Sequence, residues 1–548
     1  MNFDQKRFCI MPWVHLDINP NGTLKLCCKS LATLQGDNGA VSLYRYSIAA
    51  IWNSADIRRV RQAMLAGETL KECIVCYQEE KALGSSYRTR QNAEWLDSFS
   101  HLRFLVEQSA TRDGHVSELP MYFQINPGNL CNLKCRMCSS TFSSQIEQDP
   151  VHRQWAPPRI AYADRNLTWV DESLPIHHLS VSGINHSGFE TTPAGWRFND
   201  VASLDIALPQ GVVPTEFSFL SASTVQVAVN GKTVFIGRGT GDQIMIPSYN
   251  GTIVKFGFIA TAQDTIAEFY LYRTKPKVST IDTGAVVGSR FTTDLPWHEQ
   301  KTFLFEELVT DSVRKFYFTG GEPLIIDGVI RIIDDVIRRG IAGDVILKFN
   351  TNATKVSDAF LDKACKFKRV DISLSLDGYG ACHEYMRYPS QWKAVDNGIQ
   401  RLQTLPNVHL IAVPIIQTYN LLYLVDLLTY LEKLNIGCGV HILSVPSQLS
   451  IWLLPPNVVK EAIRRLTQYL EEKLPKITKS VTLSFIRQLE TGKNTFSQDS
   501  LRDLMLFTND LDQSRKQSIA ESLPDLLVLL QEAGVVWRTD RSSKEKAQ

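Results

Sequence analysis

The stretch NPGNLCNLKCRMCSS, residues 126–140, places three cysteines, Cys131, Cys135 and Cys138, within eight residues. Thiolates spaced this closely on a loop can converge on one small inorganic group, and soft sulfur ligands favour zinc or an iron–sulfur cluster. A structural zinc ion needs a fourth protein ligand. No histidine lies between residues 123 and 150, and the next cysteine is more than two hundred residues away. A four-iron cluster held by three cysteines fits this spacing, because its fourth iron stays free for another ligand.

A second group of cysteines precedes residue 95 and consists of Cys9, Cys27, Cys28, Cys73 and Cys76. The runs VHLDI and TLKLCC flank an Asn-Gly pair and predict a hairpin with cysteines near both of its ends. Neighbouring side chains of an extended chain point to opposite faces, so only one of the adjacent cysteines is expected to join the others. By their spacing, the resulting four thiolates suit a zinc ion and an iron–sulfur cluster with four protein ligands equally well.

The elements that must position the three-cysteine loop begin near residue 119. Short β-rich runs alternate there with amphipathic helical stretches, and the runs are PMYFQINPG, RKFYFTGG, DVILKFNTNA, RVDISLSLDG, NVHLIAVPIIQ and GCGVHILSVP. In GVIRIIDDVIRRG the apolar residues recur every three or four positions, which is typical of a helix with one buried face. The alternation predicts an α/β fold with a parallel sheet and right-handed crossovers, either open or curled into a partial (β/α)6 TIM-like barrel.

Residues 166–282 interrupt this alternation with β-like sequence. Alternating apolar and polar residues flank Asn230-Gly231 and again Asn250-Gly251, which predicts two hairpins within an inserted antiparallel β-sandwich. The predicted organisation is a cysteine-rich module at 1–95, an α/β domain in two parts at 115–165 and 283–475, the insertion at 166–282, and a C-terminal helical region at 476–548.

Composition narrows the class of protein. The chain has 548 residues, of which 44% are hydrophobic and 21% charged, as expected of a globular protein with several domains. Its net charge of +1 gives no indication of nucleic-acid binding. We find neither a signal-peptide core nor an apolar run of the roughly 18 residues that span a membrane, so we expect a cytoplasmic protein. Eleven cysteines in a reducing compartment are expected to be metal ligands rather than disulfides.

The spacing Cys131-x3-Cys135-x2-Cys138 after a strand resembles the signature of radical S-adenosylmethionine enzymes. FTGGEPL, which ends the second strand, is similar to the family's Gly-Gly-Glu-Pro segment, and NTNAT and SLDGYGACHEYMR follow the next two strands. The resemblance covers residues 119–144 and 313–455. It implies a [4Fe-4S] cluster whose free iron binds S-adenosylmethionine. Reductive cleavage of that cofactor gives methionine and a 5′-deoxyadenosyl radical, which abstracts hydrogen from a substrate.

The resemblance also implies roles for residues outside the cysteines. Gly320 and Gly321 would let the backbone approach the methionine amino group, and Glu322 would accept its ammonium. Met137 stands where many members of the family carry an aromatic residue near the adenine.

Polar residues at later strand ends complete the implied cofactor site. Asn352, Ser375 and Asp377 would meet the ribose or the carboxylate of the cofactor. Arg387 would pair with the methionine carboxylate, for which a bidentate pair is suited. Asn420, after the fifth strand, is a further candidate.

The N-terminal cysteines resemble the auxiliary-cluster module called twitch, a shortened relative of the SPASM module. GTLKLC matches its Gly-x4-Cys segment, which favours Cys27 over Cys28, and CIVCYQEEKALGSSYR is similar to its Cys-x2-Cys tail. The module usually follows the radical domain, whereas here it precedes it. The resemblance implies an auxiliary [4Fe-4S] cluster, with structural zinc as the alternative.

These observations lead to one main hypothesis and two alternatives. The first is a radical enzyme, of oxidoreductase or transferase type, that modifies a peptide or protein and receives electrons from a donor such as flavodoxin or ferredoxin. The second is an enzyme of the same class that acts on a small metabolite, nucleotide or sugar. The third, of another class, is a non-catalytic zinc-binding scaffold.

Overall fold

We describe the protein from a computed structural model. The structure describes residues 7–36, 39–155, 173–175, 184–192, 195–207, 214–240, 244–245, 253–260, 264–273, 297–299 and 307–537. The chain divides into two compact units, one formed by Met1–Asn166 with Val287–Gln548 and the other by Leu167–Val286.

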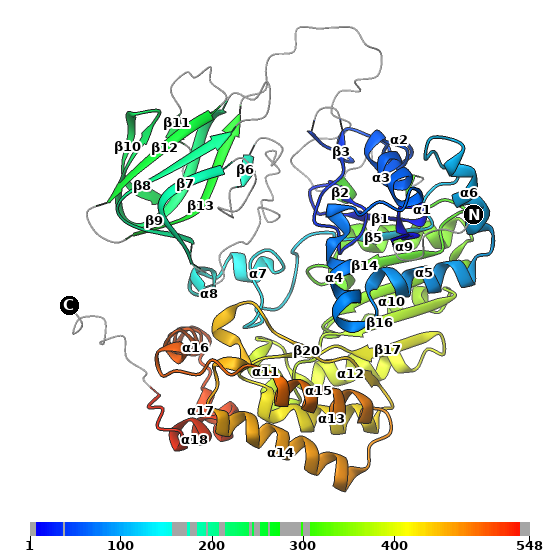
Figure 1. Cartoon of the computed structure of the whole chain (residues 1–548). Coiled ribbons are helices and arrows are strands. Elements are labelled where there is room, and N and C mark those ends of the chain that lie inside the picture. The colour runs from blue at the N-terminus through cyan, green and yellow to red at the C-terminus, as the bar shows by residue number, and fades with distance from the viewer. Residues whose placement is uncertain are drawn as a thin grey trace. The chain divides into compact units, whose positions relative to one another are not determined.

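An eight-stranded sheet is the centre of the first unit (Figure 1), and its strand order is β19-β17-β16-β15-β14-β5-β1-β2. The strands are β1 (His15–Ile18), β2 (Leu24–Lys25), β5 (Tyr122–Ile125), β14 (Lys315–Phe318), β15 (Ile346–Thr351), β16 (Arg369–Leu374), β17 (Val408–Ala412) and β19 (Gly437–Cys438). The strands from β5 to β19 are parallel, which confirms the predicted α/β class. Among the described strands the sheet is open, with β19 and β2 at its edges. Its curling into a partial barrel stays a prediction.

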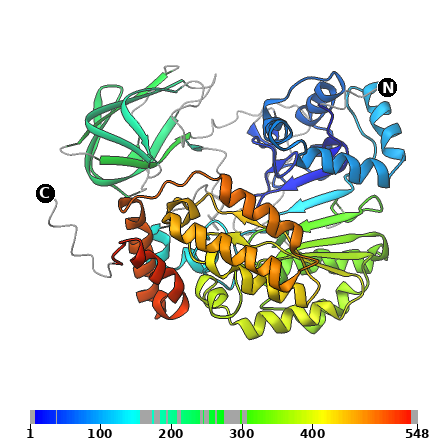
Figure 2. The same cartoon turned by 60° about the horizontal axis from the view of Figure 1, so that its bottom comes forward.

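The alternation of side chains along these strands gives the sheet two different faces. In β15 and β16, every second residue is fully buried, and these residues include Leu347, Phe349 and Ile372. Helix α9 (Asp327–Arg338) follows β14 and buries Val329, Ile332 and Ile333 among other residues. Figure 2 shows α9 and the later helices of this series along one side of the strands. These are α10 (Asp358–Ala364), α12 (Trp392–Gln403) and α13 (Leu424–Lys433).

The N-terminal hairpin extends this sheet, a connection that we did not predict. Strands β1 and β2 form the expected antiparallel hairpin. β1 also pairs in parallel with β5, with Ile18 opposite Ile125. The cysteine-rich module is therefore joined to the α/β part by backbone hydrogen bonds. Its helices are α1 (Met11–Val14), α2 (Ile48–Trp52), α3 (Ala55–Leu65), α4 (Ile74–Leu83), α5 (Tyr87–Ser98) and α6 (His101–Ala110).

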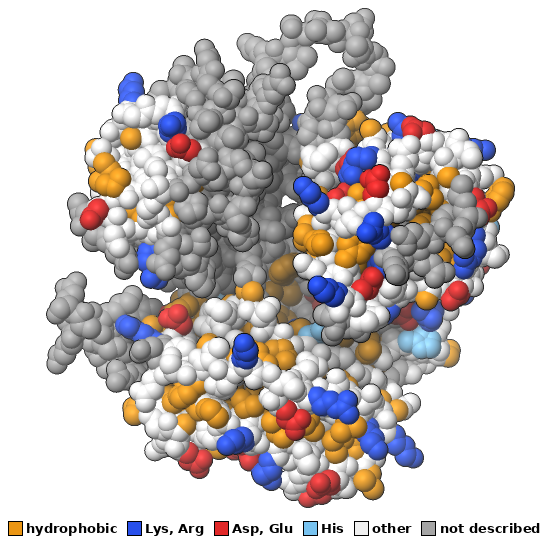
Figure 3. All heavy atoms as spheres, in the orientation of Figure 1, with side chains coloured by type: hydrophobic (Ala, Val, Ile, Leu, Met, Phe, Trp, Pro, Cys, Tyr) orange, Lys and Arg blue, Asp and Glu red, His pale blue; other side chains and the backbone are white. Residues whose placement is uncertain are grey.

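The remaining elements of the first unit are short or lie near the C-terminus. They are α7 (Ser144–Glu147), α8 (Pro150–Trp155), α11 (Gly380–Met386), α14 (Pro456–Lys473), α15 (Lys479–Thr491), α16 (Arg502–Arg515), α17 (Ile519–Ser522) and α18 (Pro524–Glu532), with the short pairs β3–β4 (Gln35–Gly36, Gly39–Ala40) and β18–β20 (Ile415–Ile416, His441–Ile442). Within the described ranges, none of the helices combines the length and the hydropathy needed to cross a bilayer. On the face in Figure 3, basic and acidic side chains are interspersed, in keeping with the net charge of +1.

The second unit is antiparallel and is made of β6 (Ser173–Pro175), β7 (Ile184–Thr192), β8 (Gly195–Ala207), β9 (Pro214–Val229), β10 (Lys232–Thr240), β11 (Ile244–Met245), β12 (Ile253–Ala260) and β13 (Asp264–Arg273). The hairpin predicted at Asn230-Gly231 is confirmed, because Val229 pairs with Lys232. Both turn residues have positive φ, 50° and 81°, as a type I′ turn requires. The second predicted turn, Asn250-Gly251, lies outside the described residues.

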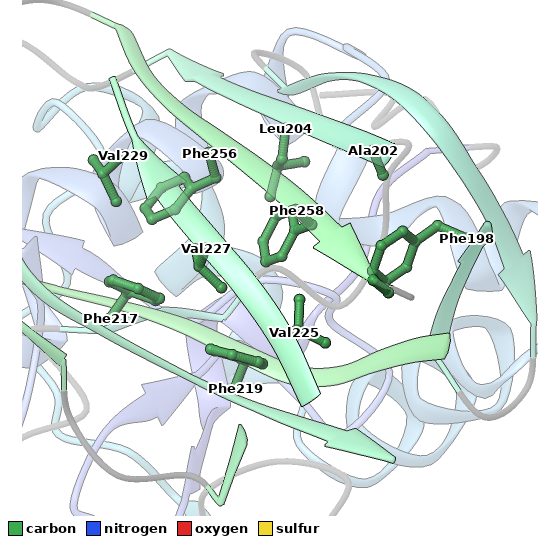
Figure 4. Close-up of a cluster of buried hydrophobic side chains, with 11 residues drawn as sticks. Phe198, Ala202, Leu204, Phe217, Phe219, Val225, Val227, Val229, Phe256 and Phe258 are labelled. Carbon is green, nitrogen blue, oxygen red and sulfur yellow. The ribbon is translucent and has the colours of Figure 1, made fainter. Parts of the chain in front are cut away.

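The strand pairing of the second unit differs from a sandwich of two separate sheets. β9 is long enough, at 16 residues, to pair with β12 near its end and with β13 nearer its start. Both partners also pair with β8, so the four strands form one continuous circuit. Aromatic side chains fill the centre (Figure 4), among them Phe217, Phe256 and Phe258, which are all buried.

Candidate iron–sulfur and cofactor site

The three-cysteine loop leaves the carboxyl end of β5 and is held in shape by the segment that follows α11. The backbone N–H of Lys134 donates to the carbonyl of Tyr388 at 2.6 Å, and that of Arg136 donates to the carbonyl of Met386 at 2.8 Å. Cys131 and Cys135 are buried with Leu133, and both Met137 and Cys138 pack against this cluster. The structure thus brings the three cysteines and Met137 together, as the spacing predicts.

Arg136 anchors the loop to the C-terminal helices and was not among the predicted residues. Its side chain is fully buried, and its guanidinium lies 3.7 Å from the ring centroid of Tyr385. It forms an ion pair with Asp512 of α16. An arginine between two candidate ligand cysteines was a signal in the sequence, but its partner lies 376 residues away.

The Gly-Gly-Glu-Pro loop packs directly on the segment that begins the cysteine loop. Gly320 and Gly321 have φ of 79° and 50°. A Cβ at Gly320 would lie 2.0 Å from Oδ1 of Asn126, and one at Gly321 would lie 2.4 Å from the carbonyl oxygen of Leu130. The backbone N–H of Glu322 donates to that same carbonyl at 2.8 Å. Both the conformation and the close approach require glycine.

Glu322 connects this loop to the end of β15. Its side chain is 1% exposed, and the carboxylate accepts hydrogen bonds from Oγ1 of Thr351 at 2.7 Å and from the N–H of Asn352 at 2.8 Å. Burial raises the pKa of Glu322. The Nδ2 of Asn352 in turn donates to Oδ1 of Asn132 in the cysteine loop at 3.0 Å. Glu322, Asn352 and Asn132 therefore connect three strand-end loops, and Asn132 was not predicted.

Arg387 and Asp377 form a buried pair beside the cysteine loop. Nε of Arg387 donates to Oδ2 of Asp377 at 2.6 Å, and Nη1 lies 3.7 Å from Sγ of Cys135. Asn420 is fully buried and donates to the backbone carbonyl of Asp377 at 2.6 Å. The backbone N–H of the half-buried Ser375 donates to the carbonyl of Thr351 at 2.8 Å.

The protonation of the three thiols depends on what the loop binds. Burial raises the pKa of Cys131 to about 12, and it also raises the pKa values of Cys135 and Cys138. Arg387 opposes this shift of pKa at Cys135. Without a compensating positive charge the thiols stay protonated at neutral pH. Metal binding at such thiols is therefore coupled to the release of protons.

Four of the N-terminal cysteines lie close enough to interact electrostatically. Cys9 interacts with Cys73 and Cys76, and Cys27 interacts with Cys9, with the adjacent Cys28 and with Cys73. Burial raises the pKa of both Cys9 and Cys73 to about 12. Cys28 interacts with Cys27, and Asp17, Lys29 and Tyr87 also act on it.

The two groups of cysteines lie toward opposite ends of the strands. The three-cysteine loop follows the carboxyl end of β5, which is parallel to β1. β2 runs in the reverse direction, with Lys25 opposite Asp17, so Cys27 returns toward the amino end of β1. Cys9 precedes α1, which leads into that same end of β1. Within the part of the chain that the structure describes, no three His, Cys, Asp or Glu side chains are arranged to hold a single metal ion.

Comparison with known families identifies the N-terminal module. Residues 9–77 match SPASM, an iron-sulfur cluster-binding domain. This match covers all five N-terminal cysteines. It confirms that the chain resembles radical S-adenosylmethionine enzymes that carry a SPASM-type module.

Similarity to individual proteins is low. No curated protein matches the chain. Native anSMEcpe with bound AdoMet is 14% identical, over 29% of this chain and 46% of that one, with a TM-score of 0.24. Streptococcus suis SuiB bound to S-adenosylmethionine is 13% identical, over 30% and 36% of the two chains, with a TM-score of 0.23. SuiB bound to the precursor peptide SuiA is 14% identical, over 33% and 37%, with a TM-score of 0.21. The chain thus spans less than half of the length of each of these structures.

Proposed function

We propose that the protein is a radical S-adenosylmethionine enzyme with an auxiliary iron–sulfur cluster. The observation that carries the proposal is the buried loop of Cys131, Cys135 and Cys138, which packs against a Gly-Gly turn that leaves no room for side chains. Three thiols suit a four-iron cluster with one open iron. A cluster bound by these thiols would supply the electron for reductive cleavage of S-adenosylmethionine.

The residues around the loop hold it rather than take part in the electron transfer. Arg387 orients Sγ of Cys135 and is itself fixed by Asp377. Glu322 and Asn352 keep the Gly-Gly turn and the cysteine loop in register, because each contacts a neighbouring strand end. The carboxylate of Glu322 accepts three hydrogen bonds, from Leu324, Thr351 and Asn352. A carboxylate can accept about four, so one acceptor position is left for the ammonium of the cofactor.

The auxiliary cluster is proposed to be bound by Cys9, Cys27, Cys73 and Cys76. Their mutual electrostatic contacts and the SPASM match support this set. Cys28 is left out because, unlike Cys27, it has neither Cys9 nor Cys73 among the main groups that shift its pKa. Four protein ligands leave no open iron, so we propose a structural or electron-transfer role for this cluster. The substrate is proposed to be a peptide or protein, and a small metabolite, nucleotide or sugar is the alternative.

Anaerobic reconstitution with iron and sulfide tests this proposal. With dithionite and S-adenosylmethionine, we expect the wild-type protein to form 5′-deoxyadenosine. Replacing Cys131, Cys135 and Cys138 by alanine should abolish the nucleoside and remove half of the bound iron. Cys365→Ala is the matched control, because Cys365 is exposed and outside both groups. A wild-type protein that holds zinc without iron, or a triple variant that still forms the nucleoside, would contradict the proposal.

A further inference from the structure

One row of residues across the sheet of the first unit is polar on five successive strands. The pairing register places Asp17 of β1 opposite Gln124 of β5, and Gln124 opposite Tyr317 of β14. Tyr317 pairs with Lys348 of β15, which pairs with Asp371 of β16. Paired residues of adjacent strands share a face of the sheet. We call these five residues the polar row.

Packing of the sheet does not account for the polar row. The next residue on each strand belongs to the opposite face, and these residues are Ile18, Ile125, Phe318, Phe349 and Ile372, all 0% exposed. A parallel sheet covered by helices on both faces has apolar strands throughout. Here every second residue is polar instead, and Tyr317, Lys348 and Asp371 are only half-buried. The polar row therefore belongs to a face that is not a closed hydrophobic core.

Across the residues that the structure describes, two groups of the polar row lack a hydrogen-bond or ion-pair partner. Gln124 is 7% exposed, and its Oε1 accepts no hydrogen bond. Among the described residues, the only direct contact recorded for Nζ of Lys348 is with the ring of Tyr317, whose centroid is 4.7 Å away. The two acids that act electrostatically on Lys348 have salt bridges of their own. Asp371 pairs with Arg369 at 2.8 Å, and Glu94 pairs with Lys315 at 2.6 Å.

The polar row lies next to the proposed cofactor site. Gln124 and Tyr317 are one residue before the last residues of β5 and β14. The cysteine loop and the Gly-Gly turn start from those two strand ends, about 3 to 7 Å further along the strands at 3.3 Å per residue. Cys28 interacts electrostatically with Tyr317 and Lys348. Cys28 therefore borders both the polar row and Cys27.

We infer that the polar row binds the substrate through an anionic oxygen group, a carboxylate or a phosphate, that pairs with Lys348. Gln124 Oε1 accepts a hydrogen bond from an N–H or O–H of the same molecule. An unpaired buried acceptor and an unpaired half-buried cation are each costly, and a ligand that satisfies both removes both costs. This inference rests on the proposed function in one respect, because only that function makes the bound ligand the substrate.

The spacing of the strands sets the size of this ligand. Gln124 and Lys348 are separated by two strand spacings, about 10 Å in total. That is the spacing of the backbones; the side chain of Lys348 reaches toward the strand between them, because its Nζ lies 4.7 Å from the ring centroid of Tyr317. An extended peptide of two to three residues, at about 3.5 Å each, is long enough to contact both groups. A sugar phosphate of similar length also fits, so the shared chemistry is an anionic group joined to a hydrogen-bond donor.

Two pairs of probes test the inference on the reconstituted full-length protein. Acetyl-Gly-Gly-Glu-amide is compared with its Gln counterpart, and ribose 5-phosphate is compared with ribose, each by the shift in melting temperature at matched ionic strength. We expect one of the anionic probes to bind and its neutral counterpart to bind at least tenfold more weakly. Lys348→Met should weaken binding of that anionic probe at least tenfold, and Lys348→Arg should restore most of it. Lys363→Met is the control, because Lys363 pairs with Asp334 outside the polar row.

The outcomes separate this inference from the proposed function. Binding of the peptide probe identifies a carboxylate ligand, and binding of the sugar phosphate identifies a phosphate ligand. The inference is wrong if neither anionic probe binds, or if Lys348→Met and the wild-type protein bind equally. Formation of 5′-deoxyadenosine by the wild-type protein is measured in parallel. A protein that forms the nucleoside and binds no probe contradicts this inference alone, whereas one that binds a probe and forms no nucleoside contradicts only the proposed function.

Discussion

Replacing Asp512, the ion-pair partner of the buried Arg136, should loosen the cysteine loop that contains Arg136. Arg136 is fully buried between Cys135 and Met137, and Asp512 of α16 is 13% exposed at its side chain. Asp512→Ala leaves the guanidinium without its anion. Breaking a buried ion pair by removing one partner costs about 3–5 kcal/mol.

The remaining contacts of Arg136 place the expected cost near the lower end of that range. Nη2 still reaches Oε1 of Gln517 at 3.1 Å, and Nε still donates to the carbonyl of Tyr385 at 2.9 Å. The stacking on Tyr385 also persists. We therefore expect Asp512→Ala to lower the free energy of unfolding by about 3 kcal/mol.

The assay combines urea unfolding with the iron content of the reconstituted protein. Asp525→Ala is the matched control, because its ion pair with Arg465 lies in the same helical region but is 45% and 27% exposed, and such a pair is worth about 1 kcal/mol or less. Asp512→Ala should lose iron from the three-cysteine loop, whereas Asp525→Ala should not. The reasoning is refuted if the two variants are equally stable, or if Asp512→Ala is destabilised yet keeps all of its iron.

Three further predictions concern single residues. Cys27→Ser should remove the iron of the auxiliary cluster, whereas Cys28→Ser should keep it. Iron analysis of each reconstituted variant checks this, and equal losses of iron in the two variants would contradict the proposed ligand set. Gly321→Ala should cost about 1–3 kcal/mol because of its positive φ and should abolish S-adenosylmethionine binding measured by calorimetry, whereas Gly343→Ala, with open space around it, should not. Burial lowers the pKa of His298 to about 4, below its ordinary 6.5, so its contribution to stability is present at neutral pH and is lost as pH falls from 6.5 to 4. Between pH 8 and pH 5 that loss is about 2 kcal/mol, and His298→Gln should flatten the pH dependence of the unfolding free energy by this amount; an unchanged pH profile would refute it.

Much of the fold and of the site followed from local sequence patterns. The alternation of β-rich runs and amphipathic helices predicted the parallel sheet, and Asn230-Gly231 predicted its hairpin, because periodicity and turn chemistry act within a few residues. The spacing of Cys131, Cys135 and Cys138 predicted one converging group for the same reason. GTLKLC favoured Cys27 over Cys28 as a ligand, and this choice stays a prediction.

Tertiary structure alone decided how distant segments meet. The parallel pairing of β1 with β5 joins residues more than a hundred positions apart, and no local pattern specifies which edge strand a hairpin joins. Arg387 contacts Asp377 and Cys135 because of where α11 packs. The sequence alone would equally allow its guanidinium to be free.

The polar row shows most clearly what the sequence determined and what the tertiary structure decided. Each strand carries its polar residue in a local alternation that is visible in KFYF or ILKFNT. Only the register of the three strands β5, β14 and β15 aligns Gln124 with Lys348 on one face. The sequence by itself therefore determined which residues have the right chemistry, because composition and spacing are local properties. The tertiary structure decided which of them act together, because cross-strand register and helix packing join residues that the chain keeps far apart.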